Sequence, residues 1–559
     1  SRNSCKFCGF IIYISVLNKF RTNVKRNKKK LLHFHKLSTT AVTATATSYT
    51  HSTAGNRQHT PICLYMIYIY KFVRIHRYCQ TTVLEVIVST LCSLVHYSSS
   101  NFTFTMAIPG MLTSKILDEF HQKFYEDKKN ILAQNVCTKS DPLECCLSRS
   151  NIEKTNHVFQ HKVSEVKPMT NQKNSGRCWI FATLNVIRIP FVKQYNLEEF
   201  EFSQPYLFFW DKIERSNYFL HNIVKTTKQG EKVEDRLVSF LLHDPTCDGG
   251  QWDMICNLIN KYGLVPKSCF PESWTSESTS RMNFLLTSKL REFAKELRII
   301  ITDGASDDLI ENKIYEQMNI IYRIVGICLG IPAQEITWEY YDKSKAYHSV
   351  GPITGLDFYK KYVKPFYNID DKVCLVTDPR PNHPFGHLYT VDCLGNVKGG
   401  RDTVYNNQPV DLLLSLVGKS IKQNEAVWFG CEVIKRFASK QGFHSIDAHD
   451  INSLFGIDTQ MGLSKADRLI YGESSMTHAM VFTGVSFDPD EKVTKLRVEN
   501  SWGEDRGEKG FIAMTADWFM EFVFEIVVDK KFVPAEVLAV FQQKPIVLPA
   551  WDPMGTLAQ

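Results

Sequence analysis

The chain of 559 residues is 44% hydrophobic and 22% charged, which excludes a disordered or fibrous protein and is typical of a globular one with two or three structural units. Its formal net charge of +7 is unevenly placed. Residues 1–105 hold fourteen Lys and Arg and one acid, Glu85, which leaves residues 106–559 at −6. Charge therefore gives no argument that the body of the chain binds nucleic acid.

The first 105 residues differ in composition from the rest. They contain a basic cluster at residues 25–30 and lack the apolar periodicity of a packed domain. One interpretation is a targeting extension, either a nuclear signal or a transit-like segment. The interpretation we favour is that the segment is not native coding sequence, with Met106 as a sensible first residue. The longest apolar run, residues 82–95, contains Glu85 and is shorter than the ~20 residues of a membrane span, so we expect no membrane association.

Apolar residues at helical spacing predict most of the elements between residues 112 and 328. A first helix is expected over residues 112–133, and the clearest one over residues 178–194, where Pro190 is expected to kink or end it. Further helices are expected over residues 204–214, 252–262, 282–297 and 308–328.

After Thr337 the pattern changes to short aromatic and β-branched runs separated by turn residues. It indicates strands and loops as far as about residue 436. Three later runs, residues 479–485, 495–499 and 510–514, predict further strands. The succession of helices and strands predicts an α+β fold.

The cysteine pattern favours a reducing compartment. Of sixteen cysteines, eleven follow Met106 without a dense, regular framework, and no Cys-x-x-Cys pair occurs after that residue. This usage is typical of intracellular proteins, whose thiols stay reduced.

A candidate nucleophile, Cys178, stands where a helix is expected to begin. Only the thiolate attacks, and a helix N-terminus or a neighbouring imidazolium lowers the thiol pKa. Gln172, six residues earlier, is placed to donate its amide N–H to a developing oxyanion. The alternative is that Cys178 is a buried core cysteine, the commonest fate of a free thiol.

Two downstream residues complete a possible catalytic set. His478 begins one apolar strand and Asn500 ends another, so the two become neighbours if these strands pair. Asn500 would then orient the imidazole, and Trp502 would shield their hydrogen bond from water. Each residue alone is equally consistent with a core histidine, a turn asparagine and a packing tryptophan.

Together these segments resemble the papain-like cysteine peptidases. The family signature is a glutamine six residues before Cys-Trp, then His-Ala, then Asn-Ser-Trp-Gly, matched here at Gln172, Cys178, His478 and Asn500. The resemblance implies a helical lobe and a β-barrel-like lobe, and peptide hydrolysis through a thiol acyl-enzyme. It implies that Cys178 is the nucleophile and His478 the general base and acid. Asn500 would orient the ring, and Gln172 would bind the oxyanion.

A third segment, residues 247–250, resembles the Cys-x-Gly-Gly motif of the family. The resemblance implies that Gly249 and Gly250 let the substrate backbone lie close. The family has a cysteine three residues before the nucleophile, disulfide-bonded to the cysteine of this motif. Here Ser175 takes the first position, so Cys247 has no such partner. This departure favours a cytoplasmic location over a lysosomal or secreted one.

The spacing of the motifs points to one branch of the family. His478 follows Cys178 by about 300 residues, against about 130–150 in the simpler members, so an insertion of about 150 residues separates the lobes. The chain is similar to cytosolic aminopeptidases of the family over about residues 112–559, and not over residues 1–105. We therefore expect a family body over residues 106–559. An inserted helical and hook-like region is expected within about residues 270–440, and a β lobe within about 440–530.

The C-terminal tail, residues 545–559, contains three prolines and Gly555, so no regular helix is expected. The resemblance implies that the tail lies in the active-site cleft, where the terminal carboxylate would pair with the α-ammonium of a peptide substrate. That carboxylate would belong to Gln559 or, after trimming, to Ala558. The resemblance also implies a homohexamer with an internal chamber, hydrolysis of related amides and thiolactones, and no cofactor.

Two rival functions stay open on the sequence. One is nucleic-acid binding, which some family members show and which the basic leader would favour if it is native. The other is a catalytically silent scaffold, against which the intact Gln172, Cys178, His478 and Asn500 count. A metal site at His444 and His449 is not expected, because no cysteine lies nearby at a ligand spacing.

Overall fold

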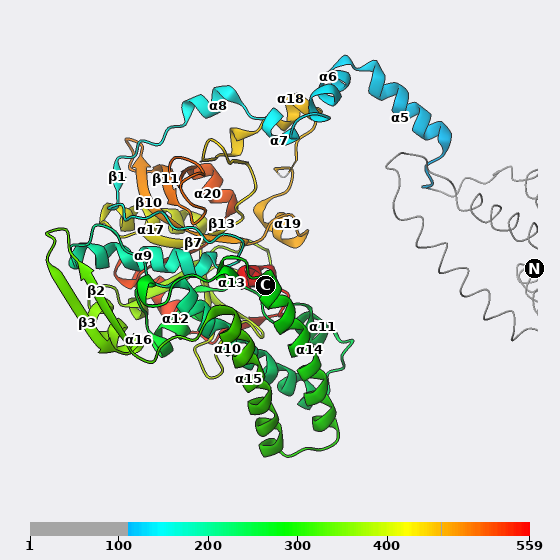
Figure 1. Ribbon diagram of the computed structural model, residues 1–559. Coiled ribbons are helices and arrows are strands. Elements are labelled where there is room, and N and C mark those ends of the chain that lie inside the picture. Colours follow the sequence, from blue (N-terminus) through cyan, green and yellow to red (C-terminus); the bar gives the residue numbers. More distant parts are fainter. Residues whose placement is uncertain (1–109, 460, 559) are drawn as a thin grey trace, which may run out of the picture. The chain divides into compact units, whose positions relative to one another are not determined.

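The computed structural model describes residues 110–459 and 461–558 (Figure 1). Contacts divide the chain into Ser1–Thr113 and Ser114–Gln559, and the expected leader falls outside the described residues. The second unit begins with four helices on one side of the sheet: α5 (Ser114–Glu126), α6 (Lys128–Cys137), α7 (Pro142–Cys145) and α8 (Arg149–Lys154). Within the described residues, no helix combines the length and apolar character needed to cross a bilayer.

The helical lobe is built around α9 (Cys178–Gln194), which is buried on almost every side. Pro190 was expected to kink or end this helix, yet the helix continues for one more turn to Gln194. The next helix begins at Ser203, whose hydroxyl accepts the Tyr206 N–H at 3.1 Å and caps the first turn. The remaining helices of the lobe are α10 (Gln204–Lys228), α11 (Arg236–His243), α12 (Trp252–Tyr262), η1 (Lys267–Cys269) and α13 (Trp274–Glu277).

A helical hairpin, α14 (Ser280–Thr302) and α15 (Asp307–Leu329), extends from this lobe in the lower part of Figure 1. The predicted apolar stripe of α14 is buried against α10 and α15, because residues three and four apart share one helix face. Ser306 caps α15 by accepting the Leu309 N–H at 3.3 Å. The predicted helices over 282–297 and 308–328 are confirmed, each slightly longer than expected.

A separate two-stranded hairpin follows, formed by β2 (Ile336–Tyr341) and β3 (Tyr347–Ile353). The expectation of strands and loops up to residue 436 is wrong for α17 (Val410–Lys422), which packs its buried side on the main sheet. Its apolar run is short enough to suit either a buried strand or a helix. Short helical segments complete the region: α16 (Gly355–Phe358), η2 (Tyr359–Val363) and η3 (Ile369–Asp371).

The main sheet has the strand order β14-β5-β6-β4-β13-β7-β10-β11-β12-β9-β8, with β1 also pairing β10. Its strands are β1 (His161–Lys162), β4 (Lys372–Val376), β5 (His387–Val391), β6 (Tyr405–Asn407), β7 (Val427–Cys431), β8 (Phe437–Ala438), β9 (Phe443–His444), β10 (His478–Phe487), β11 (Val493–Glu499), β12 (Phe511–Thr515), β13 (Val523–Asp529) and β14 (Ile546–Leu548). The three predicted late strands are confirmed as β10, β11 and β12.

The β lobe is wider than the expected range of residues 440–530. Strands β4 to β7 come from the region assigned to the insertion, since motif spacing alone carries no information on strand pairing. Helices η4 (Ile446–Ala448), α18 (Ile451–Phe455), α19 (Lys465–Ile470), α20 (Ala516–Phe522), η5 (Lys530–Phe532), α21 (Ala535–Ala539) and η6 (Val540–Gln542) surround the sheet. One apolar core fills the helical lobe, and a second lies between the sheet, α17 and α20.

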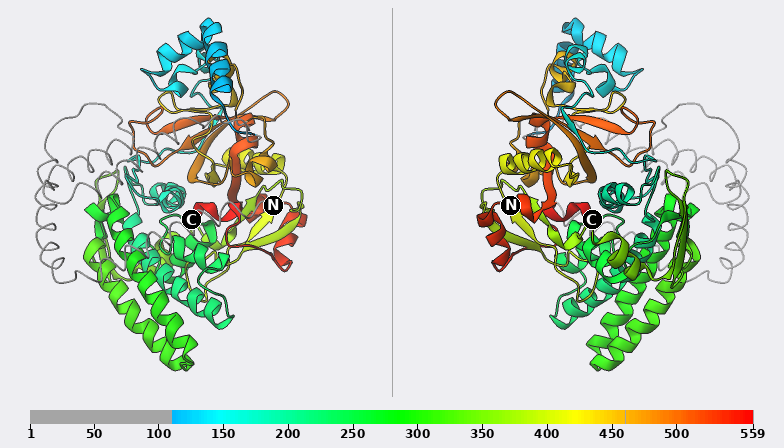
Figure 2. Two further views of the ribbon diagram at one scale, coloured as in Figure 1. Left: turned by 90° about the vertical axis from the view of Figure 1, so that its right-hand side faces the viewer. Right: turned by 90° about the vertical axis from the view of Figure 1, so that its left-hand side faces the viewer.

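The two lobes meet along α9, which packs against β10 and β7. The Trp428 indole N–H of β7 donates to the Trp179 carbonyl of α9 at 3.3 Å. The chain ends in η7 (Pro553–Ala558), drawn red in Figure 2, where both views place it between the green helices and the strands. Cys178 at the start of α9, His478 at the start of β10, and the tail therefore lie where the lobes join.

Candidate active site

Cys178 is the first residue of α9, at the end of the loop formed by residues 171–177. Its side chain is buried, and the sulfur lies 3.9 Å from the Gly176 carbonyl. The sulfur also interacts with the backbone N–H of Ala479, the residue after His478 on β10. The structure therefore brings the predicted thiol to the start of the strand that carries the predicted imidazole.

His478 is buried and bonded to Asn500, as strand pairing allows. Its Nε2 lies 2.9 Å from the Asn500 Oδ1, and the Trp502 ring lies against the imidazole with centroids 4.9 Å apart. Because Oδ1 only accepts, the Nε2 must carry the hydrogen. The neutral ring then has an unprotonated Nδ1, the nitrogen that can take a proton from a thiol.

Gln172 is joined to the same group by its backbone, whose N–H donates to the Ser501 carbonyl at 2.8 Å. Its buried side-chain amide donates one N–H to the Ser175 carbonyl at 2.7 Å. An amide nitrogen carries two hydrogens, so one N–H is left for a further acceptor. The loop before Cys178 thus contacts the Asn500 segment directly.

Burial dominates the electrostatics of the pair. It raises the pKa of the Cys178 thiol to about 11, although the Ala479 and Trp179 N–H groups act against it. It lowers the pKa of His478 to about 4, against the effect of the Asn500 hydrogen bond. Both shifts favour a neutral pair, whereas sequence reasoning expected an ionised sulfur. A thiolate–imidazolium ion pair forms from this neutral pair by transfer of one proton from Cys178 to His478, and each of the two charges then stabilises the other.

Asp248, in the Cys-x-Gly-Gly segment, is the centre of a buried polar cluster that sequence reasoning missed. Its carboxylate binds the Lys212 ammonium at 2.7 Å and accepts from Asn283 at 2.7 Å and Thr279 at 2.5 Å. It also accepts the backbone N–H of Gly176 at 3.3 Å, two residues before the thiol. We call these side chains the Asp248 cluster. Burial raises the pKa of Asp248, but Lys212, Thr279 and Asn283 outweigh burial and lower the pKa to about 2.

The Asp248 cluster connects the loop before Cys178 to the segment that carries Cys247. Cys247 is buried with a reduced thiol that accepts the Gly249 N–H at 3.1 Å. Burial raises the pKa of this thiol to about 11. The Trp179 indole donates to the Asp248 carbonyl at 2.8 Å, which adds a second tie between the nucleophile helix and this segment. Only the position of Asp248 inside the motif could have signalled its role.

Gly249 and Gly250 are positions where the backbone is approached too closely for a side chain. A Cβ on Gly250 would lie 2.6 Å from the Trp179 ring. A Cβ on Gly249 would lie 2.0 Å from the Leu557 carbonyl oxygen and 3.5 Å from the Ala558 Cα. The tail therefore lies directly on Gly249, in the place where the resemblance puts a substrate backbone.

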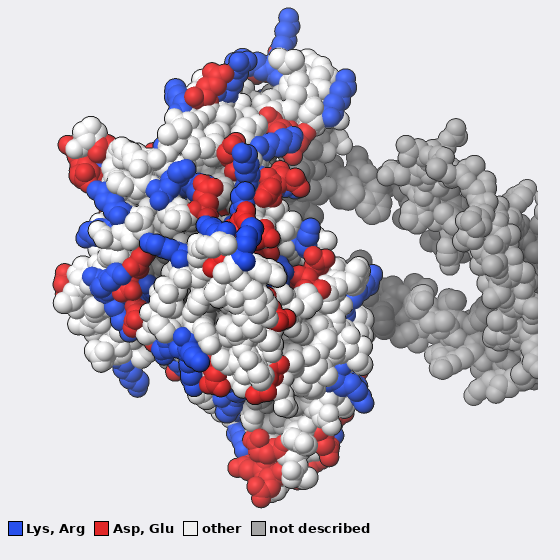
Figure 3. Space-filling view, turned by 60° about the vertical axis from the view of Figure 1, so that its left-hand side comes forward, with Lys and Arg blue, Asp and Glu red and all other residues white. Residues whose placement is uncertain are grey.

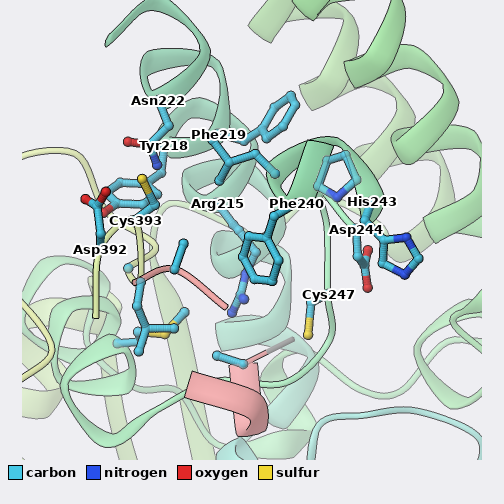
Figure 4. A pocket seen from close by; sticks show the side chains of 17 residues that line it. Arg215, Tyr218, Phe219, Asn222, Phe240, His243, Asp244, Cys247, Asp392 and Cys393 are labelled. Atoms are coloured by element: carbon cyan, nitrogen blue, oxygen red, sulfur yellow. The ribbon is translucent and has the colours of Figure 1, made fainter. Parts of the chain in front are cut away.

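The end of the tail also contacts the strand entry to His478. The Thr556 hydroxyl donates to the Met476 carbonyl at 2.9 Å. Ala558 borders a cavity of about 320 Å³, together with Ala550 and Cys247. In Figure 4, Arg215, Phe240 and Cys247 project from the helical lobe toward the tail ribbon. Gln559, the other predicted tail residue, lies outside the described residues.

The structure thus brings together Gln172, Cys178, His478, Asn500 and Trp502, with Gly249, Gly250 and Ala558 beside them. His444, by contrast, is a buried histidine whose Nε2 lies 2.9 Å from the Val433 carbonyl. Among the described residues, no group of three or more His, Cys, Asp or Glu side chains is placed to hold a metal ion.

Comparisons with known proteins agree with this geometry. The model of the Peptidase C1-like family matches residues 111–555. Bleomycin hydrolase of Mus musculus is 54% identical over 451 residues, which cover 80% of this chain and 99% of that protein. A protein of Saccharomyces cerevisiae named "Cysteine proteinase 1, mitochondrial" is 41% identical over 79% of this chain and 92% of its own length.

Among solved structures, PepW from Lactobacillus rhamnosis superposes with a TM-score of 0.76. It is 40% identical, and the match covers 80% of this chain and 99% of PepW. The family resemblance predicted from the motifs is therefore confirmed, as is the papain-like fold, and the chain is in addition similar to bleomycin hydrolases over most of its length.

Proposed function

The chain belongs to the Peptidase C1-like family and is a papain-like cysteine peptidase, and from that premise we propose that it is an aminopeptidase of the cytosol. The single observation that carries the proposal is the position of the tail, whose Leu557 carbonyl lies on Gly249 in the cleft beside Cys178. The proposed reaction removes amino-terminal residues from peptides.

The proposed chemistry begins with Cys178. Its thiol proton passes to Nδ1 of His478 while the sulfur attacks the carbonyl carbon of the scissile amide. The second N–H of Gln172 and the N–H of Cys178 stabilise the oxyanion, and one such donor is typically worth about 3 kcal/mol of barrier. His478 then protonates the leaving amine, and an acyl-enzyme thioester forms. His478 then deprotonates a water, which attacks the thioester carbon; the C–S bond breaks, the acid leaves, and the imidazolium returns its proton to the sulfur.

Asn500 holds the ring for both proton transfers. Its bond to Nε2 fixes the tautomer that exposes Nδ1 to the sulfur, and Trp502 covers this bond. The neutral state favoured by burial suits this order of events, because the imidazole must start as a base.

The tail supports the choice of aminopeptidase over endopeptidase. A peptide in the cleft would meet η7 at Gly249, so chain beyond that point has no room. A terminal carboxylate after Ala558 would pair with a free α-ammonium, and its charge counts for more where water is excluded. The cavity beside Ala558 leaves space around this chain end.

Two experiments test the proposal. First, Cys178→Ala is compared with the wild type on aminoacyl amides, and turnover should fall by several orders of magnitude with an unchanged melting temperature. Retained turnover in the alanine variant would remove Cys178 from the mechanism.

Second, deletion of residues 554–559 should shift the products from single amino acids toward internal fragments. An unchanged product pattern from the truncated protein would refute the role of the tail. Hydrolysis of bleomycin-like amides is proposed on the names of the relatives, and hydrolysis of thiolactones on the family resemblance; both are checked with the same two variants.

We also propose a homohexamer that encloses the active sites. Large apolar side chains on α5 and α6 support association, since Leu117, Phe120 and Leu132 expose 50%, 54% and 67% of their surface. Sedimentation of the purified protein decides the order of the assembly.

A cytosolic location is supported by the eleven cysteines of the described residues, all of which are reduced. One relative is named mitochondrial, so imaging of a protein tagged within a surface loop is the appropriate test. The rival activity, nucleic-acid binding, gains no support from the face in Figure 3. There basic and acidic side chains alternate, and acidic residues, including Asp303, Asp307 and Asp308, gather at the tip of the α14–α15 hairpin.

A further inference from the structure

The tail reaches the cleft along a path with several attachments. It begins with β14, which pairs in parallel with β5 at the edge of the sheet. Trp551 then lies under the Arg236 guanidinium, with 4.0 Å from its central carbon to the ring centroid. The last attachment is the contact of η7 with Gly249. Between the strand and the last turn lies Asp552, the one acidic residue of the tail.

Asp552 forms a two-pronged ion pair with Arg380. The guanidinium donates to the two carboxylate oxygens at 2.7 and 3.1 Å. The same guanidinium donates to Asp378 from Nε at 2.9 Å and from Nη2 at 2.7 Å. The Arg380 side chain is 13% exposed and the carboxylates 5% and 4%, so water screens these charges little. We call Arg380, Asp378 and Asp552 the tail anchor.

The tail anchor is fixed to the sheet. Asp378 follows β4 by two residues, and its backbone N–H donates to the Asn407 Oδ1 of β6 at 2.8 Å. The Asn407 Nδ2 returns a hydrogen bond to the Asp378 carbonyl at 3.0 Å. His383 adds a contact of 2.5 Å between its Nδ1 and the Asp378 carboxylate. Asn407 and His383 thus fix Asp378, which in turn holds the guanidinium that binds the tail.

Asp552 also starts the last helical turn. Its Oδ1, which receives Arg380, accepts the Met554 N–H at 3.0 Å, and its carbonyl accepts the Gly555 N–H at 2.9 Å. A carboxylate that accepts the N–H groups of a first turn fixes where and in which direction that turn begins. Only six residues follow Asp552 up to Ala558, and all of them belong to the short helix η7.

We propose that Arg380 and Asp552 are positioning residues that set how far the chain end extends along the cleft. They thereby set how many substrate residues fit between the chain end and Cys178. This inference rests on the proposed aminopeptidase function and names the residues that determine its specificity. Without the ion pair, β14 still holds the start of the tail, but η7 loses its fixed origin and leaves the cleft open to longer chains.

The test uses Asp552→Asn, which keeps the shape and the acceptor oxygen but removes the charge, and Arg380→Lys, which keeps the charge but loses the forked geometry. Lys372→Ala is the matched control. Lys372 is the first residue of β4, at the opposite end of that strand from Asp378, and the substitution removes its ion pairs with Asp529 at 2.8 Å and Glu425 at 3.2 Å. Each protein is incubated with one decapeptide bearing either a free or an acetylated amino end, and products are identified by mass.

The wild type and Lys372→Ala should release single residues from the free peptide and cleave the acetylated peptide only at a slow background rate. Asp552→Asn and Arg380→Lys should each cleave the acetylated peptide at least tenfold faster than the wild type does. These two variants should also release dipeptides. Their turnover of a single aminoacyl amide should fall by a smaller factor than their cleavage of the acetylated peptide rises. The double variant should cleave the acetylated peptide at the same rate as either single variant, because each substitution removes the same ion pair.

The truncated protein lacking residues 554–559 separates the two levels of the argument. If truncation opens the cleft to the acetylated peptide and folded Asp552→Asn and Arg380→Lys do not, the tail anchor has no role in specificity, although the proposed function stands. If truncation also leaves the pattern unchanged, both the anchor and the role of the tail are refuted. If either Asp552→Asn or Arg380→Lys does not fold, the result of the other variant decides whether the tail anchor has a role.

Discussion

The Asp248 cluster makes a quantitative prediction about the loop that carries the nucleophile. In Asp248→Asn the side chain keeps its shape, but the buried Lys212 ammonium loses its counter-charge. The lowering of the Asp248 pKa to about 2, from an ordinary value of 3.8, corresponds to about 2 kcal/mol of net favourable interaction with the carboxylate. Breaking a buried pair from one side costs about 3–5 kcal/mol. We therefore expect the free energy of unfolding to fall by about 3 kcal/mol.

A disulfide at the position used elsewhere in the family should restore what Asp248→Asn removes. Ser175→Cys places a thiol in the loop that contacts the segment of Cys247, and oxidation would close a loop of about 70 residues. Such closure is worth about 4 kcal/mol, which exceeds the expected loss. The oxidised Ser175→Cys/Asp248→Asn protein should therefore melt at or above the wild-type temperature, and its reduced form below it.

The assay is thermal unfolding with and without dithiothreitol, together with kcat on an aminoacyl amide. For a body of about 450 residues, a loss of 3 kcal/mol lowers the melting temperature by on the order of 3 °C. The control is Cys247→Ser in the same background, which cannot form the bond. If Asp248→Asn melts with the wild type, or if the oxidised variant forms the bond by mass and gains nothing, the Asp248 cluster does not replace the disulfide.

Three further predictions concern the site. Gln172→Ala should lower kcat by 10²–10³ with a smaller change in KM, as expected for an oxyanion donor, and an unchanged kcat would exclude that role. Gly250→Ala should lower the free energy of unfolding by about 1–3 kcal/mol, because its Cβ would lie 2.6 Å from the fully buried Trp179 ring. A variant as stable as the wild type would show that this contact relaxes freely. Since the pKa of His478 is lowered to about 4, stability present at neutral pH should be lost as pH falls from about 6.5 toward 4, by about 3 kcal/mol. His478→Gln should show a correspondingly shallower loss over this interval in urea titrations, and equal slopes would contradict the shift.

The fold could be predicted where one helix face repeats over many turns. Helices α9 and α12 have the predicted limits, because loop-forming or glycine residues bound a long apolar pattern. Helix α17 was missed, since the run of residues 410–417 is mostly apolar and too short to separate helix from strand. The strand order could not be predicted either, because β4 pairs with β13 about 150 residues later and β7 pairs with β10 about 50 residues later.

The candidate site divides in the same way. Gln172, Cys178, His478 and Asn500 lie in short segments with a recognisable order, so sequence alone nominated them. Asp248 receives Lys212, Thr279 and Asn283 from different parts of the helical lobe, and no spacing in the chain announces that convergence. Arg380 and Asp552 are about 170 residues apart, and an isolated acid in a proline-containing tail carries no signal of its partner. Contacts that depend on the folded arrangement of distant residues required the structure.

The close approach of Leu557 to Gly249 has a consequence for how this protein is made. Residues 553–558 form a wall of the cleft, so its geometry is complete only after these residues have been synthesised. Nascent polypeptides that already carry Cys178 and His478 lack that wall.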